Sequence, residues 1–184
     1  MASILKVDTI QDQDGNNIIN ENAGTITIGK SGDTVNLASG ATAGFGKVLQ
    51  VVSANKTDAF STTSTSFVDV TGLSVSITPA SSSNKIYIVA TVYMSSEDAP
   101  NQLTLVRNST SIQSFQDYAD YSTSGAYGSS MSCSYLDSPS TTSATTYKLQ
   151  IKSDSGNNAK VNQRWDSGAA DIGDSTITVM EIEA

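Results

Sequence analysis

The chain has 184 residues, with 18 acidic and 10 basic side chains, a net charge of −8 and no histidine. This negative charge disfavours binding to nucleic acids and to anionic membrane surfaces. The lack of histidine excludes Ser-His-Asp and Cys-His catalysis and histidine-ligated zinc. Cys133 is the only cysteine, so no intramolecular disulfide can form and stability must come from burial and assembly. No run of 18 apolar residues occurs, so we expect no membrane insertion.

The first 47 residues predict very short β-strands separated by turn residues. Each strand offers only two or three apolar side chains, too few to bury within one chain. Yet the alternation in residues 25–28, Thr-Ile-Thr-Ile, is too regular for a disordered linker. The predicted strands are residues 4–10, 17–19, 25–28 and 34–37. We expect copies of the chain to intertwine here as a β stalk, with a core of Ile18, Ile19, Ile26, Ile28, Val35 and Leu37.

Residues 38–47 are small and glycine-rich, which favours a neck and places a boundary near Lys47. Residues 48–184 then show longer alternating patterns and no amphipathic helical stretch. Residues 86–94 are almost continuously apolar and predict the central buried strand. The strand signals are residues 48–54, 65–70, 73–77, 86–94, 102–107, 111–115, 127–136, 145–152, 160–165 and 176–182. Short strands with loops between them predict an all-β, antiparallel, jelly-roll-like β-sandwich.

A family resemblance rests on both ends of the chain. The opening Ser3-Ile-Leu-Lys-Val-Asp-Thr-Ile-Gln-Asp-Gln-Asp-Gly-Asn-Asn-Ile-Ile19 and the stretch from Thr25 to Val35 resemble the start of tail fibre and other virion proteins of marine bacteriophages, such as those infecting cyanobacteria. Residues 60–79 and 175–184 are similar to the distal domain of the same proteins. The resemblance implies a homotrimeric fibre located in the virion. Its N-terminal segment would dock on other tail or capsid proteins through Leu5, Val7 and Ile10.

The stretch around residues 118–135 mixes tyrosine with serine and glycine, which is typical of recognition loops. Tyrosine rings give rigid contact area and can stack on sugar faces. The alternatives are a solvated sheet edge and a contact between copies. The lone Trp165 is either a carbohydrate platform or a cover over the core or a subunit seam. The candidate receptor-binding residues are therefore Tyr118, Tyr121, Tyr127, Tyr135 and Trp165.

Acidic residues suggest two further sites, for which simpler interpretations are available. Asp166, Asp171 and Asp174 would suit calcium, but their spacing matches no calcium loop and favours turns. Glu181 and Glu183 share one strand face, as two hydrolytic carboxylates could, but a solubilising charged edge is the simpler interpretation. We therefore expect no metal, no cofactor and no catalytic residue.

Three functions remain open. The first is a non-enzymatic tail fibre whose sandwich binds a glycan or protein on the host cell surface by multivalent contacts. The second is a structural connector or decoration protein without a receptor. The third is a hydrolase of surface polysaccharide. The N-terminal residues 1–8 lack a basic region followed by a long apolar stretch, so we expect synthesis in a host cytoplasm without a signal peptide.

Overall fold

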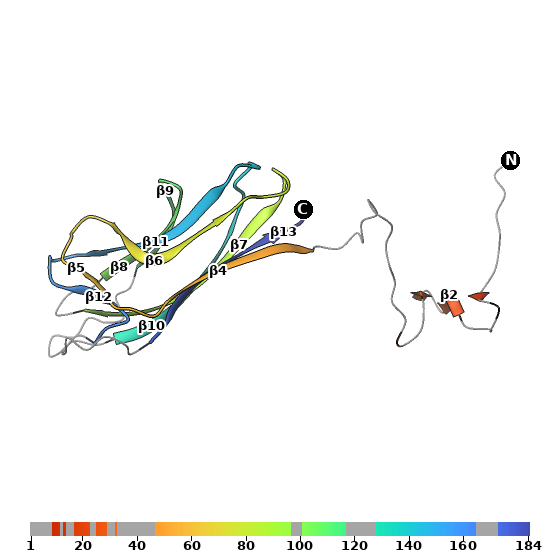
Figure 1. Cartoon of the computed structure of the whole chain (residues 1–184), viewed down its shortest axis with the longest axis horizontal. Helices are drawn as coiled ribbons and strands as arrows, with labels where there is room; N and C mark the ends of the chain where they lie inside the picture. Colours follow the sequence, from red (N-terminus) through yellow and green to blue (C-terminus); the bar gives the residue numbers. More distant parts are fainter. Residues whose placement is uncertain are drawn as a thin grey trace. The chain divides into compact units, whose positions relative to one another are not determined.

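The computed structural model describes residues 9–11, 13, 17–22, 25–28, 32, 47–96, 101–116, 128–164 and 173–184. The chain divides into two compact units, unit 1 (residues 1–45) and unit 2 (residues 46–184) (Figure 1). In these ranges every regular element is a β-strand and every pairing of strands is antiparallel, which confirms the all-β prediction. The described residues contain no helix that could span a membrane.

Unit 1 contains a small sheet of three consecutive strands, β1 (Thr9–Gln11), β2 (Asn17–Asn22) and β3 (Thr25–Ile28). Ile19 lies in the centre, opposite Ile10 on one side and Ile28 on the other. These three side chains form one row and are 42%, 37% and 56% exposed in the order Ile10, Ile19, Ile28. Ile10, expected in a separate docking element, thus belongs to the same sheet as the expected stalk residues. The side chains of Ile18 and Ile26, and all of Leu5, Val7, Val35 and Leu37, lie outside the described part.

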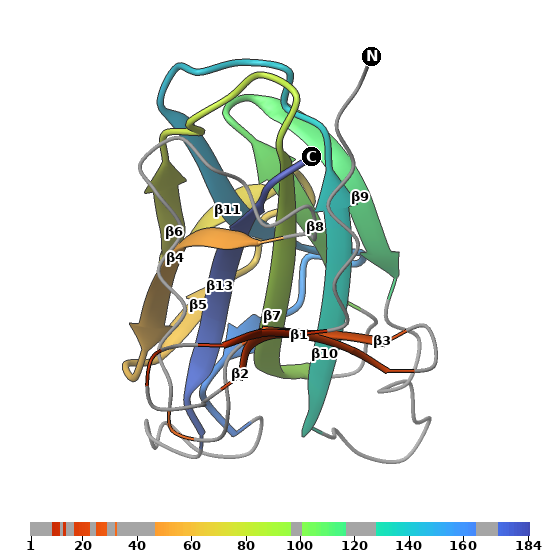
Figure 2. The same ribbon diagram turned by 90° about the vertical axis from the view of Figure 1, so that its right-hand side faces the viewer.

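The larger sheet of unit 2, the front sheet, is built around β7 (Lys85–Ser96). On one side β7 pairs with β10 (Gly128–Asp137). On its other side it pairs first with β13 (Ser175–Ile182) and then with β12 (Ala159–Val161). The sheet is completed by β4 (Val48–Lys56) beside β13 and by β5 (Phe60–Thr62) beside β12. Figure 2 shows β10, β7 and β13 running side by side.

The second sheet, the back sheet, has four strands in the order β6-β11-β8-β9. They are β6 (Val68–Ile77), β11 (Thr145–Ser153), β8 (Asn101–Arg107) and β9 (Thr110–Gln116). Alternate residues of the two sheets point at each other and form one hydrophobic core, with Ile88 and Ile177 from the front sheet and Leu105 and Leu149 from the back sheet among the buried residues. Apolar alternation in the sequence therefore produces two sheets packed face to face.

Residues 86–94 form the central strand of their sheet, as predicted, but only one of its faces lies in the core. Ile86, Ile88 and Ala90 are buried, whereas the intervening Tyr87 and Val89 face outward and are only partly covered. A nearly continuous apolar run predicts burial on both faces. The structure instead leaves Tyr87 and Val89 on an apolar outer face of this strand.

The two strands predicted at residues 65–70 and 73–77 are one long strand, β6, which begins at Val68 and continues through Thr71-Gly72. Gly72 has a positive φ of 93°, and the pairing with β11 shifts register between Lys148 and Gln150. A glycine in this conformation inserts a bulge without ending the strand. The aliphatic part of the Lys56 side chain lies over Gly72. A Cβ added to Gly72 would make an ordinary contact with the Lys56 Cγ at 3.6 Å. The short strand β5 was not predicted from sequence.

The sandwich has two distinct ends. At the entry end the chain arrives from unit 1 through Lys47, whose carbonyl accepts a hydrogen bond from the N–H of Glu183 at 2.9 Å. Figure 1 shows the C-terminus beside the start of β4 at this end, with β5 and β12 at the opposite, far end. Strands β7 and β9 end at the far end, at Ser96 and Gln116, and β8 and β10 begin there, at Asn101 and Gly128. Arg164, which follows β12, and Gly173, which precedes β13, lie at the same end.

Candidate recognition surface

Most of the candidate recognition residues belong to two segments of the chain, and both segments begin and end at the far end of the sandwich. Strand β9 ends at Gln116 and β10 begins at Gly128, so both flanks of the segment containing Tyr118, Tyr121 and Tyr127 lie here. Arg164 and Gly173 likewise flank the segment containing Trp165. These four aromatic residues lie outside the described part of the chain. The topology nevertheless brings the flanks of both segments to one end, opposite the connection to unit 1.

Tyr93 is an aromatic side chain that the structure places at the far end and that the sequence prediction missed. It lies on the outer face of β7, and its hydroxyl packs on Gly128. A Cβ added to Gly128 would collide with the Tyr93 hydroxyl oxygen, so no larger residue fits without moving the ring. On the other side, a Cβ on Gly173 would contact the Tyr93 Cβ at 3.5 Å. Tyr93 therefore lies between Gly128, which follows the segment containing Tyr118 to Tyr127, and Gly173, which follows the segment containing Trp165.

A buried polar cluster beneath this end ties four strands together through Asn162. Its side-chain Nδ2 donates to the carbonyl of Lys56 at 2.7 Å, and its Oδ1 accepts from Ser175 Oγ at 2.6 Å. Ser175 Oγ in turn accepts the N–H of Tyr93 at 3.1 Å, and the N–H of Asn162 donates to the Tyr93 carbonyl. Asn162 has φ of 54°, a left-handed conformation that asparagine tolerates. Because buried polar groups are costly unless satisfied, this cluster gives the far end a rigid base.

A second pair of polar residues extends the same base toward the back sheet. Asn101 is buried and donates its Nδ2 to the Ser95 carbonyl at 2.9 Å, while Ser95 Oγ donates to the Gln163 carbonyl at 2.6 Å. Lys160, also buried, donates from Nζ to the Arg164 carbonyl at 3.4 Å. These bonds link the strand ends that flank residues 97–100 and 165–172. The far end is thus a set of strand ends held together by buried hydrogen bonds.

Tyr135 is separated from the other predicted recognition residues. It lies on the inner face of β10, opposite Ile88, and packs against the hydrophobic core. Seven residues of strand, about 23 Å, separate it from Gly128 at the far end. The tyrosine-rich stretch looked continuous in sequence, but β10 alternates its side chains between core and solvent and carries Tyr135 toward the entry end. Its position makes Tyr135 a packing residue.

Glu181 is not part of a charged, solubilising edge, because its side chain is completely buried. Its Oε1 accepts hydrogen bonds from Asn84 Nδ2 at 2.6 Å and from the N–H of Ala80 at 2.7 Å, and its Oε2 accepts from Gln50 Nε2 at 2.5 Å. Burial raises the pKa of this carboxyl, but the hydrogen bonds outweigh burial and hold the pKa below its ordinary value. A general acid in glycoside hydrolysis needs the opposite shift. Glu181 is suited to anchoring the turn at residues 78–84.

The predicted acidic loop contributes one described residue, Asp174, whose carboxylate accepts a 3.4 Å hydrogen bond from Asn55 Nδ2. Asp166 and Asp171 lie outside the described residues. Within the ranges that the structure describes, no three acidic or cysteine side chains gather closely enough to hold a metal ion.

Cys133 faces the core from β10, and burial raises the pKa of its thiol to about 11, which keeps it protonated at neutral pH.

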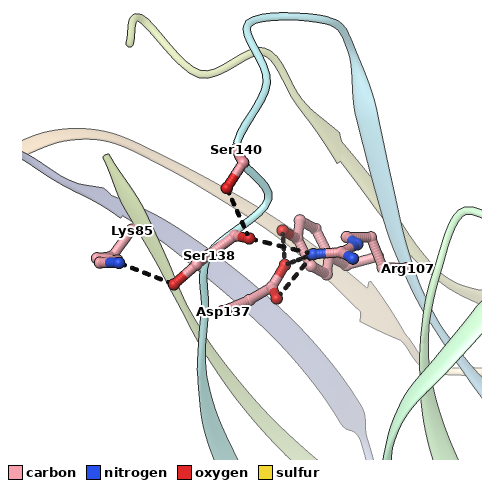
Figure 3. A network of polar contacts seen from close by, with 6 residues as sticks. Lys85, Arg107, Asp137, Ser138 and Ser140 are labelled. Carbon is pink, nitrogen blue, oxygen red and sulfur yellow. Dashed lines mark hydrogen bonds and ion pairs between the residues drawn. The ribbon is translucent and has the colours of Figure 1, made fainter. Parts of the chain in front are cut away.

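The entry end carries a polar network centred on Asp137 (Figure 3). Arg107 Nη1 lies 2.9 Å from both carboxylate oxygens of Asp137, and Tyr147 donates its hydroxyl to the same carboxylate at 2.6 Å. Burial and the adjacent Asp137 carboxylate raise the pKa of Tyr147, so that its hydroxyl stays a donor. The Arg107 guanidinium is partly open to solvent. The network joins β8, β10 and β11 and closes this end of the core.

Comparison with known proteins gives little further information. No protein-family model matches the chain, and no curated protein matches it. Among solved structures, one of infectious bursal disease virus, Gx strain, is 15% identical, with a TM-score of 0.35. The match covers 82% of the present chain and 44% of the viral chain, so the present chain spans less than half of that protein. A TM-score at this level does not establish a shared fold.

Proposed function

We propose that this protein is a homotrimeric bacteriophage tail fibre protein that joins the virion through unit 1 and presents a jelly-roll-like sandwich for host-cell recognition. The observation that carries the proposal is the opposed arrangement of the two ends of unit 2. The chain enters from unit 1 at Lys47, whereas the flanks of both aromatic segments lie at the far end. A fibre needs this arrangement, because attachment and recognition must not compete for one surface.

The character of the far end supports recognition of a cell-surface glycan or protein. Tyr93, held between Gly128 and Gly173, gives rigid aromatic area, and the serines of the adjacent segment 118–135 are adaptable hydrogen-bonding groups. The buried Asn162 cluster supplies a firm base, and rigid presentation lowers the entropy cost of binding. Three copies on each fibre and several fibres on each particle would turn weak single contacts into strong adsorption. No cofactor or metal enters this mechanism.

The isoleucine row of unit 1 supports assembly of copies. Ile10, Ile19 and Ile28 are exposed on a sheet of only three short strands, which is marginal in water unless its apolar face is covered. Covering this row with the rows of two other copies buries it without any further domain. Docking on another tail or capsid protein would then engage residues of unit 1 on the side away from this row.

The test is adsorption of labelled full-length protein to a panel of bacterial cells, including cyanobacteria, with and without periodate oxidation of surface glycans. The variant replaces Tyr118, Tyr121 and Tyr127 with alanine. The matched control replaces Ser82 and Thr142, two exposed residues in entry-end loops, with alanine. We expect the tyrosine variant to lose adsorption at least tenfold, with an unchanged circular dichroism spectrum and oligomer mass, while the control binds normally. Equal adsorption by both variants would refute recognition and favour a structural connector.

A further inference from the structure

The outer face of the front sheet has an unusual composition for this acidic chain. Its outward positions follow from the register of β4, β13, β7 and β10, whose alternate residues are buried in the core. They are Val51, Ser53, Asn55, Thr176, Thr178, Met180, Ile182, Lys85, Tyr87, Val89, Thr91, Tyr93, Ser130, Ser132, Ser134 and Leu136. None of these strand positions carries a carboxylate, although the chain has 18 acidic residues. Asp174, directly before β13, lies at the far end, where it accepts a hydrogen bond from Asn55. Lys85 is the single charged residue among them, and it donates to Ser138 Oγ at 2.8 Å.

An apolar row crosses all four strands of this face near the entry end. Val51 lies opposite Met180, Met180 opposite Tyr87, and Tyr87 opposite Leu136. Val51 and Leu136, at the two ends of the row, are 56% and 57% exposed. Val48, half exposed, and Ile182 lie next to the row and face each other across β4 and β13. Contiguous exposed apolar residues of this kind mark an interaction site more often than isolated ones do.

The outer face of the back sheet is different and provides an internal comparison. Lys148 Nζ lies 2.8 Å from Asp69 Oδ2, and Gln150 donates to the same carboxylate. Lys152 Nζ lies 3.4 Å from Asp154 and also sits over the Phe67 ring. Charged and paired side chains of this type suit permanent contact with water. The two outer faces of one sandwich therefore differ in the way expected when one faces solvent and the other a partner.

Charge and position point to a second copy of this chain as the partner. Copies that each carry a charge of −8 repel one another, so they can meet closely only on a surface free of carboxylates. The apolar row also lies at the entry end, directly after the connection to unit 1. Copies held together through unit 1 would bring these rows together at millimolar effective concentration.

The size of the face is consistent with an interface that forms only between copies already joined through unit 1. Four strands about 4.8 Å apart and about eight residues long present an area on the order of 500 Å². A stable interface between separate proteins buries about 800 Å² on each partner. The face is therefore too small to hold free copies together, but sufficient for copies already joined through unit 1.

We infer that the outer face of β4, β13, β7 and β10, short of Tyr93 at the far end, packs against the other copies of the chain in the assembled fibre, with the row from Val51 to Leu136 at the contact. The inference rests on the proposed homo-oligomer and adds where its sandwiches meet. It leaves the back sheet exposed to solvent and the far end free for recognition. Three copies each using this surface around a threefold axis form a closed ring of heterologous contacts.

The experiment measures maleimide labelling of single introduced cysteines in the full-length chain. Leu136→Cys lies in the proposed contact, and Ser74→Cys lies at an exposed position on the back sheet. The unmodified chain serves as the blank, because its own Cys133 is half-buried. We expect Leu136→Cys to be labelled at least tenfold more slowly than Ser74→Cys. Adding Ile19→Asp, which should separate the copies through unit 1, should bring the two rates together.

The oligomer mass, measured by sedimentation on the same samples, separates the possible failures. An oligomer in which Leu136→Cys is labelled as fast as Ser74→Cys would overturn the inference and leave the oligomer intact. A monomer would overturn both the inference and the proposed trimer. A second variant, Val51→Glu with Leu136→Glu, should weaken association at least tenfold, while Thr71→Glu with Ser74→Glu on the back sheet should leave it unchanged. Equal association of the two double variants would also contradict the inference.

Discussion

Arg107 and Asp137 form an ion pair in which one guanidinium nitrogen, Nη1, lies 2.9 Å from each carboxylate oxygen of the almost fully buried Asp137. The two residues are 30 positions apart, on β8 and on β10, and belong to different sheets. The pair therefore links the two layers of the sandwich at the entry end. Tyr147, from β11, completes the set by donating its hydroxyl to the same carboxylate.

Replacing Asp137 with asparagine should destabilise unit 2 by about 2–4 kcal/mol. The substitution leaves Arg107 without its carboxylate and forces the amide to face the Tyr147 hydroxyl with only one acceptor. Asp69→Asn is the matched control, since Asp69 makes an ion pair of similar length to Lys148 on the exposed face of the back sheet, where such a pair contributes about 0–1 kcal/mol. Urea denaturation gives both values. Equal losses for the two variants would show that burial of Asp137 does not matter.

Glu181 should make unit 2 sensitive to acid. Its pKa in the folded chain lies below the ordinary value of 4.5, so its hydrogen bonds contribute fully above that value. The contribution is lost as the pH falls through the lower, folded-state pKa. We expect the free energy of unfolding to fall as the pH drops below the ordinary carboxyl value of 4.5, and to fall less steeply in Glu181→Gln. Glu183→Gln should retain the steep slope of the natural chain. Parallel curves for all three would contradict this assignment.

Gly128→Ala should destabilise the far end by about 1–3 kcal/mol, because the added methyl collides with the Tyr93 hydroxyl. The clash involves the far end of one side chain, so removing that side chain should remove the effect. In a double-mutant cycle, Gly128→Ala should be nearly neutral when Tyr93→Ala is already present. Thermal denaturation of the four proteins tests the coupling. Additive effects of the two substitutions would show that Tyr93 does not pack on Gly128.

Asn162 and Asn108 have the same left-handed backbone, with φ of 54° and 55°, but different surroundings. Asn108 is exposed in a turn, where its Oδ1 accepts the N–H of Thr146 at 2.9 Å. Asn162 is buried and bonds to Lys56 and Ser175. Alanine at position 108 should therefore cost about 1 kcal/mol, and alanine at position 162 about 3 kcal/mol or more. A smaller loss at position 162 than at 108 would exclude the buried cluster as the base of the far end.

Ile19→Asp should dissociate the assembled protein while leaving the sandwich folded. Ile19 is the centre of the exposed row in unit 1, and burying it among copies would place like charges side by side. Gln13→Asp, an exposed position of the same unit, is the control with an equal change in charge. Sedimentation should give a monomer mass for the first variant and an unchanged mass for the second. The unfolding midpoint of unit 2 should shift little in either variant.

The sequence by itself determined the all-β class, most of the strand positions in residues 48–184, though not β5, and the central place of residues 86–94. These features depend on alternation of apolar residues, which is written locally in the chain. The same local signal misjudged Thr71-Gly72, because a glycine that makes a bulge and a glycine that ends a strand look alike until the pairing with β11 is known. Only the tertiary structure decided that Glu181 is buried, that Tyr135 faces the core, and that Tyr93 stands between Gly128 and Gly173. Each of these depends on which distant strands become neighbours, and strand order is set by packing over the whole sandwich.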